Sequence, residues 1–305
     1  MRFAPLLVAA LCLGSVARAQ IELRLSTDRD FFLPGEELDL TVKVANFSGG
    51  PLTLGEQADW IRFTVERSDS GVVNKLSEVS ESGSFTLDHA TVGTLHFNLM
   101  PHFALDRPGT YRVVAQATTP KSAEIYSSEA KSFEIVSGVR LNPDRVLGVT
   151  LPDGTTVKRK YILQQVNFLR KLRLYLRVTD GDESTNFKVT NLGNVVTFDP
   201  PRWVVDRQNR FHVLHRIDAN SSAYHLFETN GQITRRELYR YTTTTPELRV
   251  NEAGEVAVIG GVRRPSPGDI PAPGTNRPPA KVTTADLKPE ENAKPPTEPT
   301  PERKP

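Results

Sequence analysis

An internal repeat constrains the fold of this chain more than any other feature of its sequence. Residues 201–216 (PRWVVDRQNRFHVLHR) align without a gap on residues 246–261 (PELRVNEAGEVAVIGG), an offset of 45 residues. Each copy alternates apolar and polar residues on both sides of a polar turn, which predicts two strands joined as a hairpin. Periods of roughly 40–50 residues are typical of repeated antiparallel β-structure. The repeat therefore predicts an antiparallel β-meander, and no catalytic motif overlies it.

A second offset extends the repeat toward the N-terminus. Residues 174–196 match residues 212–234 at a spacing of 38 residues, so the connections vary while the strands persist. We therefore assign a repeated β domain to residues 138–263. These units resemble the blades of β-propellers, but two complete units and a partial third are too few to close a propeller, which needs at least four.

Two further segments of this domain have local signals. Residues 146–163 contain two apolar runs separated by Pro152-Asp153-Gly154-Thr155, a strong hairpin turn. Apolar residues fall every three positions over 161–172 (Leu163, Val166, Leu169 and Leu172), which is compatible with a helix. The clean alternation over 172–178 favours a strand instead.

Residues 20–137 alternate apolar and polar side chains throughout, with turns every 8–15 residues. This pattern predicts a β-sandwich. The segments FLPGEELDLTVKVANFSGGPL and RPGTYRVVAQA resemble bacterial immunoglobulin-like domains and the related macroglobulin-type sandwiches. The resemblance implies a tyrosine corner at Tyr111, whose hydroxyl would bind the backbone where its strand starts. Val113 stands where antibody domains carry a cysteine, so the resemblance implies no disulfide here.

The two ends of the chain have compositions of their own. Residues 1–19 combine a charged start, a short apolar run and an A-x-A site before Gln20, which predicts a secretory signal peptide cleaved after Ala19. Cys12, the single cysteine, lies within it. Residues 264–305 contain 12 of the 23 prolines and no aromatic residue, which predicts a disordered tail. We therefore expect an exported protein, periplasmic or extracellular, of Gram-negative type and without a transmembrane segment after processing.

Charge is divided unequally between the two β domains. The first domain has a net charge of −7 and the second of +6. Arginine outnumbers lysine in the second domain, which suits bidentate contacts to carboxylate or phosphate. The arginines that recur across the repeat are the candidate anion-binding residues: Arg202, Arg207, Arg210, Arg216, Arg235, Arg236 and Arg240. The alternative is a charged surface that only keeps the domain soluble.

Other chemistry has little support in the sequence. No phosphate loop, nucleophile elbow or zinc-protease motif occurs, so we expect no catalytic residue, no metal and no cofactor. His212 and His215 are three residues apart on a strand and should face opposite sides, one buried and one solvated. The acidic turn at 180–184 could bind calcium, although the twelve-residue calcium loop is missing.

Together these patterns predict an all-β protein: a sandwich, a repeated β domain and a disordered tail. The function that fits best is non-enzymatic binding or scaffolding in the bacterial envelope, with an anionic glycan or an acidic protein as partner. Nucleic acid is excluded by the export signal. Two alternatives remain open, an enzyme acting on envelope polysaccharide and a secreted protease inhibitor.

Overall fold

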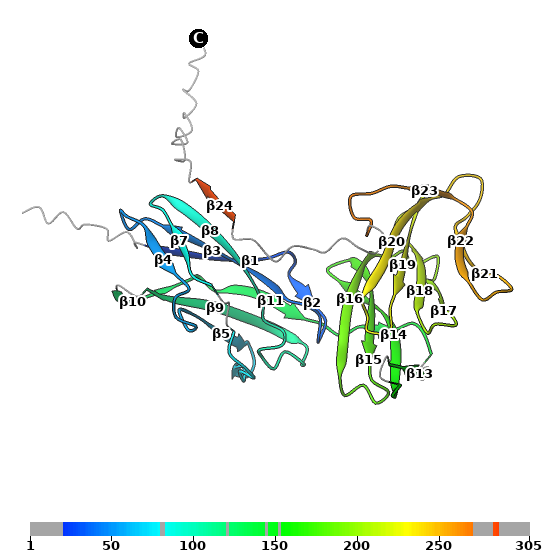
Figure 1. Ribbon diagram of the computed structural model, residues 1–305, viewed down its shortest axis with the longest axis horizontal. Coiled ribbons are helices and arrows are strands. Elements are labelled where there is room, and N and C mark those ends of the chain that lie inside the picture. Colours follow the sequence, from blue (N-terminus) through cyan, green and yellow to red (C-terminus); the bar gives the residue numbers. More distant parts are fainter. Residues whose placement is uncertain are drawn as a thin grey trace, which may run out of the picture.

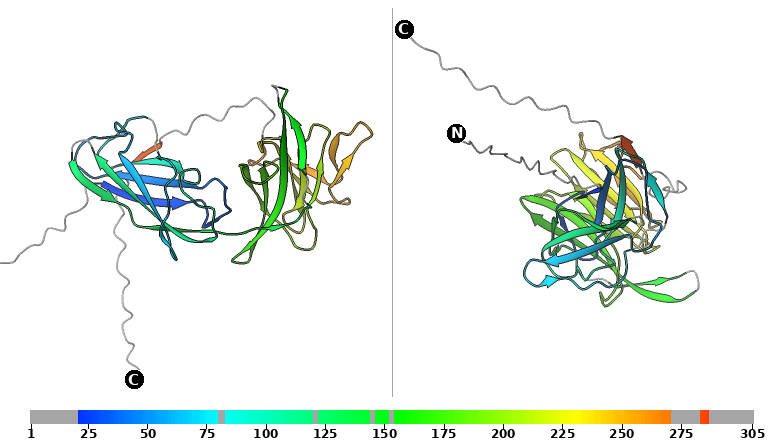
Figure 2. Two further views of the ribbon diagram at one scale, coloured as in Figure 1. Left: turned by 90° about the horizontal axis from the view of Figure 1, so that it is seen from below. Right: turned by 90° about the vertical axis from the view of Figure 1, so that its left-hand side faces the viewer.

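The computed structural model describes residues 21–79, 83–119, 122–143, 146–151, 154–270 and 283–286. These residues form strands and turns and contain no helix, which confirms the predicted all-β fold. Figures 1 and 2 show two β-sandwiches arranged end to end along the long axis of the molecule. The predicted signal peptide, residues 1–19, lies outside the described residues.

The first sandwich consists of two main sheets and one small sheet (Figure 1). One main sheet contains β1 (Ile21–Thr27), β3 (Asp39–Asn46) and β8 (Thr91–Asn98). The other contains β2 (Phe31–Phe32), β11 (Lys131–Ile135), β9 (Gly109–Thr119), β5 (Ile61–Arg67) and β6 (Gly71–Val72), and β10 (Ser122–Ser127) also pairs with β9. The small sheet contains β4 (Leu52–Leu54) and β7 (Phe85–Leu87).

Alternation along these strands builds the core of the first sandwich. In β3, Leu40, Val42 and Val44 are fully buried, while Lys43 between them is exposed. Successive side chains on a strand point to opposite faces, so this pattern gives one apolar face to bury against the facing sheet. Val113, which stands where antibody domains carry a cysteine, is fully buried in this core.

The predicted tyrosine corner is confirmed. The hydroxyl of Tyr111 donates a hydrogen bond to the backbone carbonyl of Arg107 at 2.6 Å, four residues before it. Its ring is buried and stacks on Phe133 with 5.6 Å between ring centroids. The bond ties the start of β9 to the loop that precedes it.

The second sandwich also has two main sheets. One contains β12 (Val139–Arg140), β13 (Val146–Thr150), β14 (Thr156–Phe168), β15 (Lys171–Thr179) and β16 (Asn186–Asn194). The other contains β17 (Arg202–Val205), β18 (Phe211–Arg216), β19 (Ser221–Phe227), β20 (Ile233–Arg240) and β23 (Val262–Arg264). A separate hairpin contains β21 (Glu247–Val250) and β22 (Val256–Ile259).

The sequence repeat corresponds to hairpins in this sandwich. Its two copies are the hairpins β17–β18 and β21–β22. The four strands β17 to β20 pair antiparallel in chain order, as predicted for a meander. The two main sheets share one core, in which Leu163 and Leu176 of one sheet pack with Phe211 and Phe227 of the other. The sheets therefore face each other as a sandwich, whereas blades stand around a common axis.

Residues 161–172, whose pattern was compatible with either a helix or a strand, belong to two strands and the turn between them. Residues 156–168 form β14, and β15 follows after a turn of only two residues, Leu169 and Arg170. Both have positive φ angles, 47° and 63°. The sequence did not indicate this turn, because neither residue type favours the left-handed region. The predicted turn at 152–155 does join β13 to β14, although Pro152 and Asp153 lie outside the described residues.

The tail predicted to be disordered, residues 264–305, is described only in part. Residues 264–270 are described and begin with the end of β23. The backbone of β24 (Thr283–Asp286) pairs antiparallel with β8 of the first sandwich, with Thr283 opposite Thr94. Residues 271–282 and 287–305 lie outside the described residues. No helical segment in the described part of the chain has the length and apolar character to cross a bilayer.

The two sandwiches contact each other through a small apolar cluster and polar links. Phe31 and Leu33 of the first sandwich pack with Val166, Tyr175 and Val189 of the second. The backbone of Glu36 forms a parallel bridge with that of Val189. Lys188 and Glu37 form an ion pair across the same junction, 3.1 Å between Nζ and Oε2. These contacts bring the loop between β1 and β2 to one end of the second sandwich.

Candidate functional site

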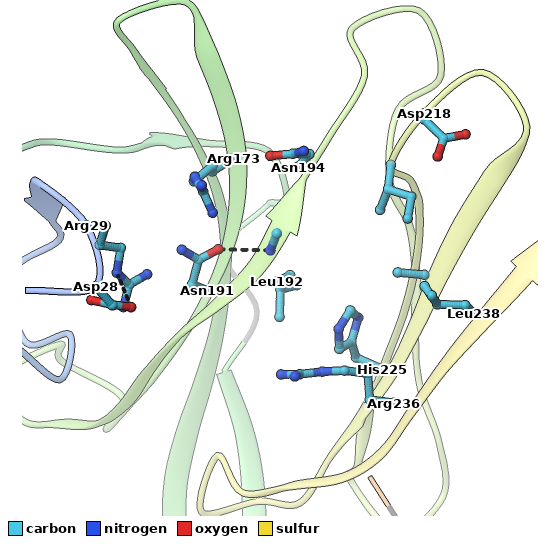
Figure 3. Close-up of a pocket in the computed structure, with 13 residues that line it drawn as sticks. Asp28, Arg29, Arg173, Asn191, Leu192, Asn194, Asp218, His225, Arg236 and Leu238 are labelled. Atoms are coloured by element: carbon cyan, nitrogen blue, oxygen red, sulfur yellow. Dashed lines mark hydrogen bonds and ion pairs between the residues drawn. The ribbon is translucent and has the colours of Figure 1, made fainter. Parts of the chain in front are cut away.

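A cavity of about 510 Å³ lies at this junction (Figure 3). It is lined by both sheets of the second sandwich and by the β1–β2 loop of the first. Its principal polar residues are Arg29 and Asp28 from that loop, Arg173 from β15, Asn191 from β16, Asp218 from the β18–β19 turn, and His225 and Arg236 from β19 and β20. The apolar part of the lining consists of Leu192, Ile217, Ala223 and Leu238.

Strand β20 directs Arg236 into the cavity. Arg236 lies opposite His225 of β19 in the antiparallel pairing, so both side chains are on the sheet face that looks toward the other sheet. The preceding residue, Arg235, is on the opposite face. Its Nη2 lies 2.7 Å from Oε1 of Glu237, and its guanidinium stands 5.6 Å from the ring centre of Tyr224. Two neighbouring arginines thus have different surroundings.

Arg236 and Arg173 have no ion-pair partner among the described residues. The Nε atoms of both are buried without a hydrogen bond. Burial lowers the pKa of Arg236 below its ordinary value. The guanidinium of Arg173 lies 6.0 Å from the ring centre of Phe31. A cation taken partly out of water without a counter-charge is costly, so the cavity is suited to receive an anion.

Two stacked histidines lie behind Arg236. His215 and His225 are both buried, with ring centroids 5.5 Å apart and planes 16° apart. Burial lowers the pKa of His215 to about 4 and that of His225 well below its usual value, the latter also through His215 and Arg236. Nδ1 of His225 has no hydrogen-bond partner, and the ring of His215 lies against the backbone of Leu192 and Asn194 without a well-aligned bond. Both rings are therefore neutral near pH 7.

The sequence-based expectation for His212 and His215 is half right. They do face opposite sides of β18, but both are buried. The outer face of this sheet is covered by the hairpin β21–β22, whose Leu248 and Val258 pack on Leu214 and its neighbours. His212 is therefore enclosed on a face that the sequence pattern assigned to solvent.

His212 belongs to a buried polar array on this outer face. Its Nε2 lies 3.1 Å from Oδ2 of Asp206, and its Nδ1 lies 2.9 Å from the hydroxyl of Tyr224. Asp206 also accepts a hydrogen bond from Nε of Arg210 at 2.7 Å. The order of groups is that of a catalytic relay, yet Tyr224 is buried and burial raises its pKa to about 12. The tyrosine oxygen is therefore neither ionised nor accessible to a substrate.

The structure separates the seven candidate arginines. Four are ion-paired with neighbouring acids, three of them as follows: Arg202 with Glu247, Arg210 with Asp206 and Arg216 with Asp199. Arg235 pairs with Glu237, Arg207 donates to the carbonyl of Glu252, and Arg240 ends β20. Arg236 alone of the seven lines the cavity. The sequence did not single out Arg29, Arg173 or His225 as site residues, because nothing in the pattern shows that they converge.

The acidic turn at 180–184 has a different role from the one considered for calcium. Glu183 lies 2.7 Å from Nζ of Lys160 and 2.8 Å from Nη2 of Arg177, and it also pairs with Arg140. These cations lower the pKa of Glu183 to about 2. Its carboxylate is thus already neutralised by side chains. Within the described ranges, no group of three or more histidine, cysteine, aspartate or glutamate residues is placed to hold a metal ion.

The fold and the cavity define a protein of two consecutive β-sandwiches with a basic pocket at their junction. No known protein family and no curated protein match the chain. Among solved structures, the sporulation control protein Spo0M from Bacillus subtilis is similar over 53% of this chain and 80% of that one, with 15% identity and a TM-score of 0.30. A family 123 glycoside hydrolase from Clostridium perfringens is similar over 40% of this chain and 28% of that one, with 13% identity and a TM-score of 0.24. Likeness at this level supports no statement about function.

Proposed function

We propose that this protein is an exported, non-enzymatic binding protein of the bacterial envelope that holds an anionic group in the cavity at the junction of its sandwiches. The ligand class is an acidic glycan, whose carboxylate would meet Arg236. The observation that carries the proposal is the pair of guanidinium groups, Arg173 and Arg236, that face the cavity without a carboxylate partner among the described residues.

The remaining wall suits the hydroxyl groups of a sugar. The side-chain amide of Asn191 bonds the hydroxyl of Tyr175 at 3.1 Å and the backbone N–H of Gly193 at 2.8 Å, so its orientation is fixed. Asp28 and Asp218 add acceptors near the opening. They would also repel a ligand with many negative charges, which favours a single carboxylate with neutral polar groups around it.

Binding is favoured over catalysis by the contacts of these two carboxylates. Glycoside hydrolysis needs one carboxyl group that is protonated and can donate to the leaving oxygen. Asp28 lies 3.4 Å from Nε of Arg29, and Asp218 accepts a hydrogen bond from the backbone N–H of Asn220 at 2.8 Å. Each carboxylate thus already has a donor close to it within its own loop. The export and the immunoglobulin-like kinship of the first sandwich, inferred from the sequence, are part of the same proposal.

The test compares two neighbouring arginines. Binding of glucuronate, a small carboxylate sugar, is measured by calorimetry for the intact mature protein, for Arg236→Gln and for the matched control Arg235→Gln. A charged hydrogen-bond pair contributes about 1.5–3 kcal/mol, so Arg236→Gln should bind on the order of tenfold to a hundredfold more weakly. Arg235→Gln should bind as the original does, because Glu237 keeps Arg263 at 3.4 Å.

Two results would contradict the proposal. Absence of glucuronate binding by the intact protein excludes this ligand class from the cavity. Equal losses in the two variants would show that a diffuse charged surface binds the probe, and the exposure of Arg236 and Arg173 to the cavity would then have no role.

A further inference from the structure

Arg29, one of the cations that line the cavity, also forms an ion pair with the buried carboxylate of Glu36. Nη1 of Arg29 lies 2.7 Å from Oε1 of Glu36, and the other oxygen of Glu36 accepts the backbone N–H of Leu33 at 2.9 Å. The Glu36 side chain is 2% exposed, whereas Arg29 is 20% exposed and lines the cavity. Arg29 therefore stands between a buried anion and the proposed ligand space.

Glu36 lies at the seam between the two sandwiches. Its backbone bridges to Val189, and the fully buried Tyr175 of β15 lies close to both Glu36 and Arg29. Burial is the main cause that raises the pKa of Glu36 to about 7, against the opposing effects of Arg29 and the Leu33 amide. The charged and titratable groups around this carboxylate are Arg29, Asp28 and Tyr175, followed by Arg173 and the Glu37–Lys188 ion pair.

We infer that anion binding in the cavity is coupled to protonation of Glu36, because the guanidinium that pairs with Glu36 also lines the cavity that receives the anion. This inference rests on the proposed function of the cavity. A second negative charge in the cavity that Arg29 lines disfavours the ionised form of Glu36, so binding takes up a fraction of a proton near pH 7. By the reciprocity of linked equilibria, acidification strengthens anion binding.

The direction of the pH dependence of anion affinity follows from the net charge of the Arg29–Glu36 ion pair. Near pH 6 Glu36 is largely neutral, and the positive charge of Arg29 acts on the cavity alone. Near pH 8.5 Glu36 is ionised and cancels much of that charge. A pKa displacement of about one unit on binding makes the affinity about five- to tenfold higher at the lower pH. His225 stays neutral over this range, because burial holds its pKa well below the usual value.

The experiment measures glucuronate affinity at pH 6 and pH 8.5 for the mature protein, for Glu36→Gln and for Glu37→Gln. Glucuronate is the right probe because its charge is constant over this range, unlike that of phosphate. We expect the pH dependence in the original protein and in the Glu37→Gln control, since Glu37 is exposed and pairs with Lys188. Glu36→Gln should bind with an affinity that no longer changes with pH.

A second measurement needs no variant. Calorimetry of the original protein near pH 7, in buffers of different ionisation enthalpy, should show uptake of protons on binding. Binding that depends on Arg236 but takes up no proton, or a pH dependence that persists in Glu36→Gln, would overturn the coupling and leave the proposed function intact. If the original protein does not bind glucuronate at either pH, the proposed function and the coupling are both wrong.

Discussion

Acidification should destabilise the second sandwich through its stacked histidines, and the effect can be calculated. His215 has a pKa of about 4 in the folded protein against about 6.5 in an unfolded chain. Its contribution to stability is complete above the unfolded pKa and is lost as the pH falls from 6.5 toward 4, because the unfolded chain then binds the proton more tightly. Between pH 8 and pH 5 this loss amounts to about 2 kcal/mol. His225 acts in the same direction.

Glu36 opposes this effect. Its pKa of about 7 is higher than in an unfolded chain, so its contribution is present at low pH and is lost as the pH rises through 7. From pH 8 to pH 5 it adds about 2.5 kcal/mol to the free energy of unfolding. The contributions of His215 and Glu36 nearly cancel, so the pH profile of the original protein alone would not isolate the effect of the histidines. Substitutions are needed to separate them.

The assay is urea unfolding at pH 8 and pH 5 of the original protein and of His215→Phe, in a Trp60→Phe background. Fluorescence then reports on Trp203, which stacks on Phe211 in the second core at 5.8 Å. The difference in unfolding free energy between the two pH values should change by about 2 kcal/mol in His215→Phe, in the sense of greater acid resistance. An unchanged difference would refute the neutral, buried state of His215.

Two further predictions concern local structure. Replacing Leu169 by Asn and Arg170 by Gly should stabilise the protein by about 1–2 kcal/mol in urea unfolding, because these types accept the left-handed conformation of the β14–β15 turn; no gain would mean that the original side chains make compensating contacts. Removing residues 271–305 should leave the melting temperature unchanged within error, since a four-residue strand gains net backbone hydrogen bonds of only about 0.5–1.5 kcal/mol each against a similar ordering entropy; a drop of several degrees would show that β24 docks firmly on β8.

The elements that could be predicted from the sequence are those with a local cause. Alternation fixed the faces of strands such as β3, because the period of a strand matches the period of the pattern. Gly154 marked its hairpin, and Tyr111 marked its corner. The turn at Leu169 and Arg170 could not be predicted, because tertiary pairing of two long strands overrides the local preference of these residues.

For the candidate site, the sequence predicted only the type of residue, arginine, and not which arginines line the cavity. An excess of arginine indicated an anion site, and one of the seven candidates, Arg236, lines the cavity. Which arginines are neutralised depends on acids brought close by hairpin packing, as Glu247 is to Arg202. Arg29 belongs to the acidic half of the chain and reaches the cavity only because the two sandwiches meet there. Composition and spacing contain no information of this kind.

The way in which Thr234 is accommodated in β20 decides which arginine faces the cavity. The pairing of β19 with β20 shifts between Leu226 and Phe227: Phe227 lies opposite Ile233, but Leu226 lies opposite Arg235, which leaves Thr234 as an extra residue. Without this bulge, Arg235 would lie opposite His225 and point inward in place of Arg236. Which guanidinium faces the cavity therefore depends on strand register as much as on side-chain identity. Pairing Thr234 with Leu226 in a regular ladder would exchange the two arginines without replacing either of them, whereas deleting Thr234 would leave Arg235 opposite Leu226 and Arg236 opposite His225.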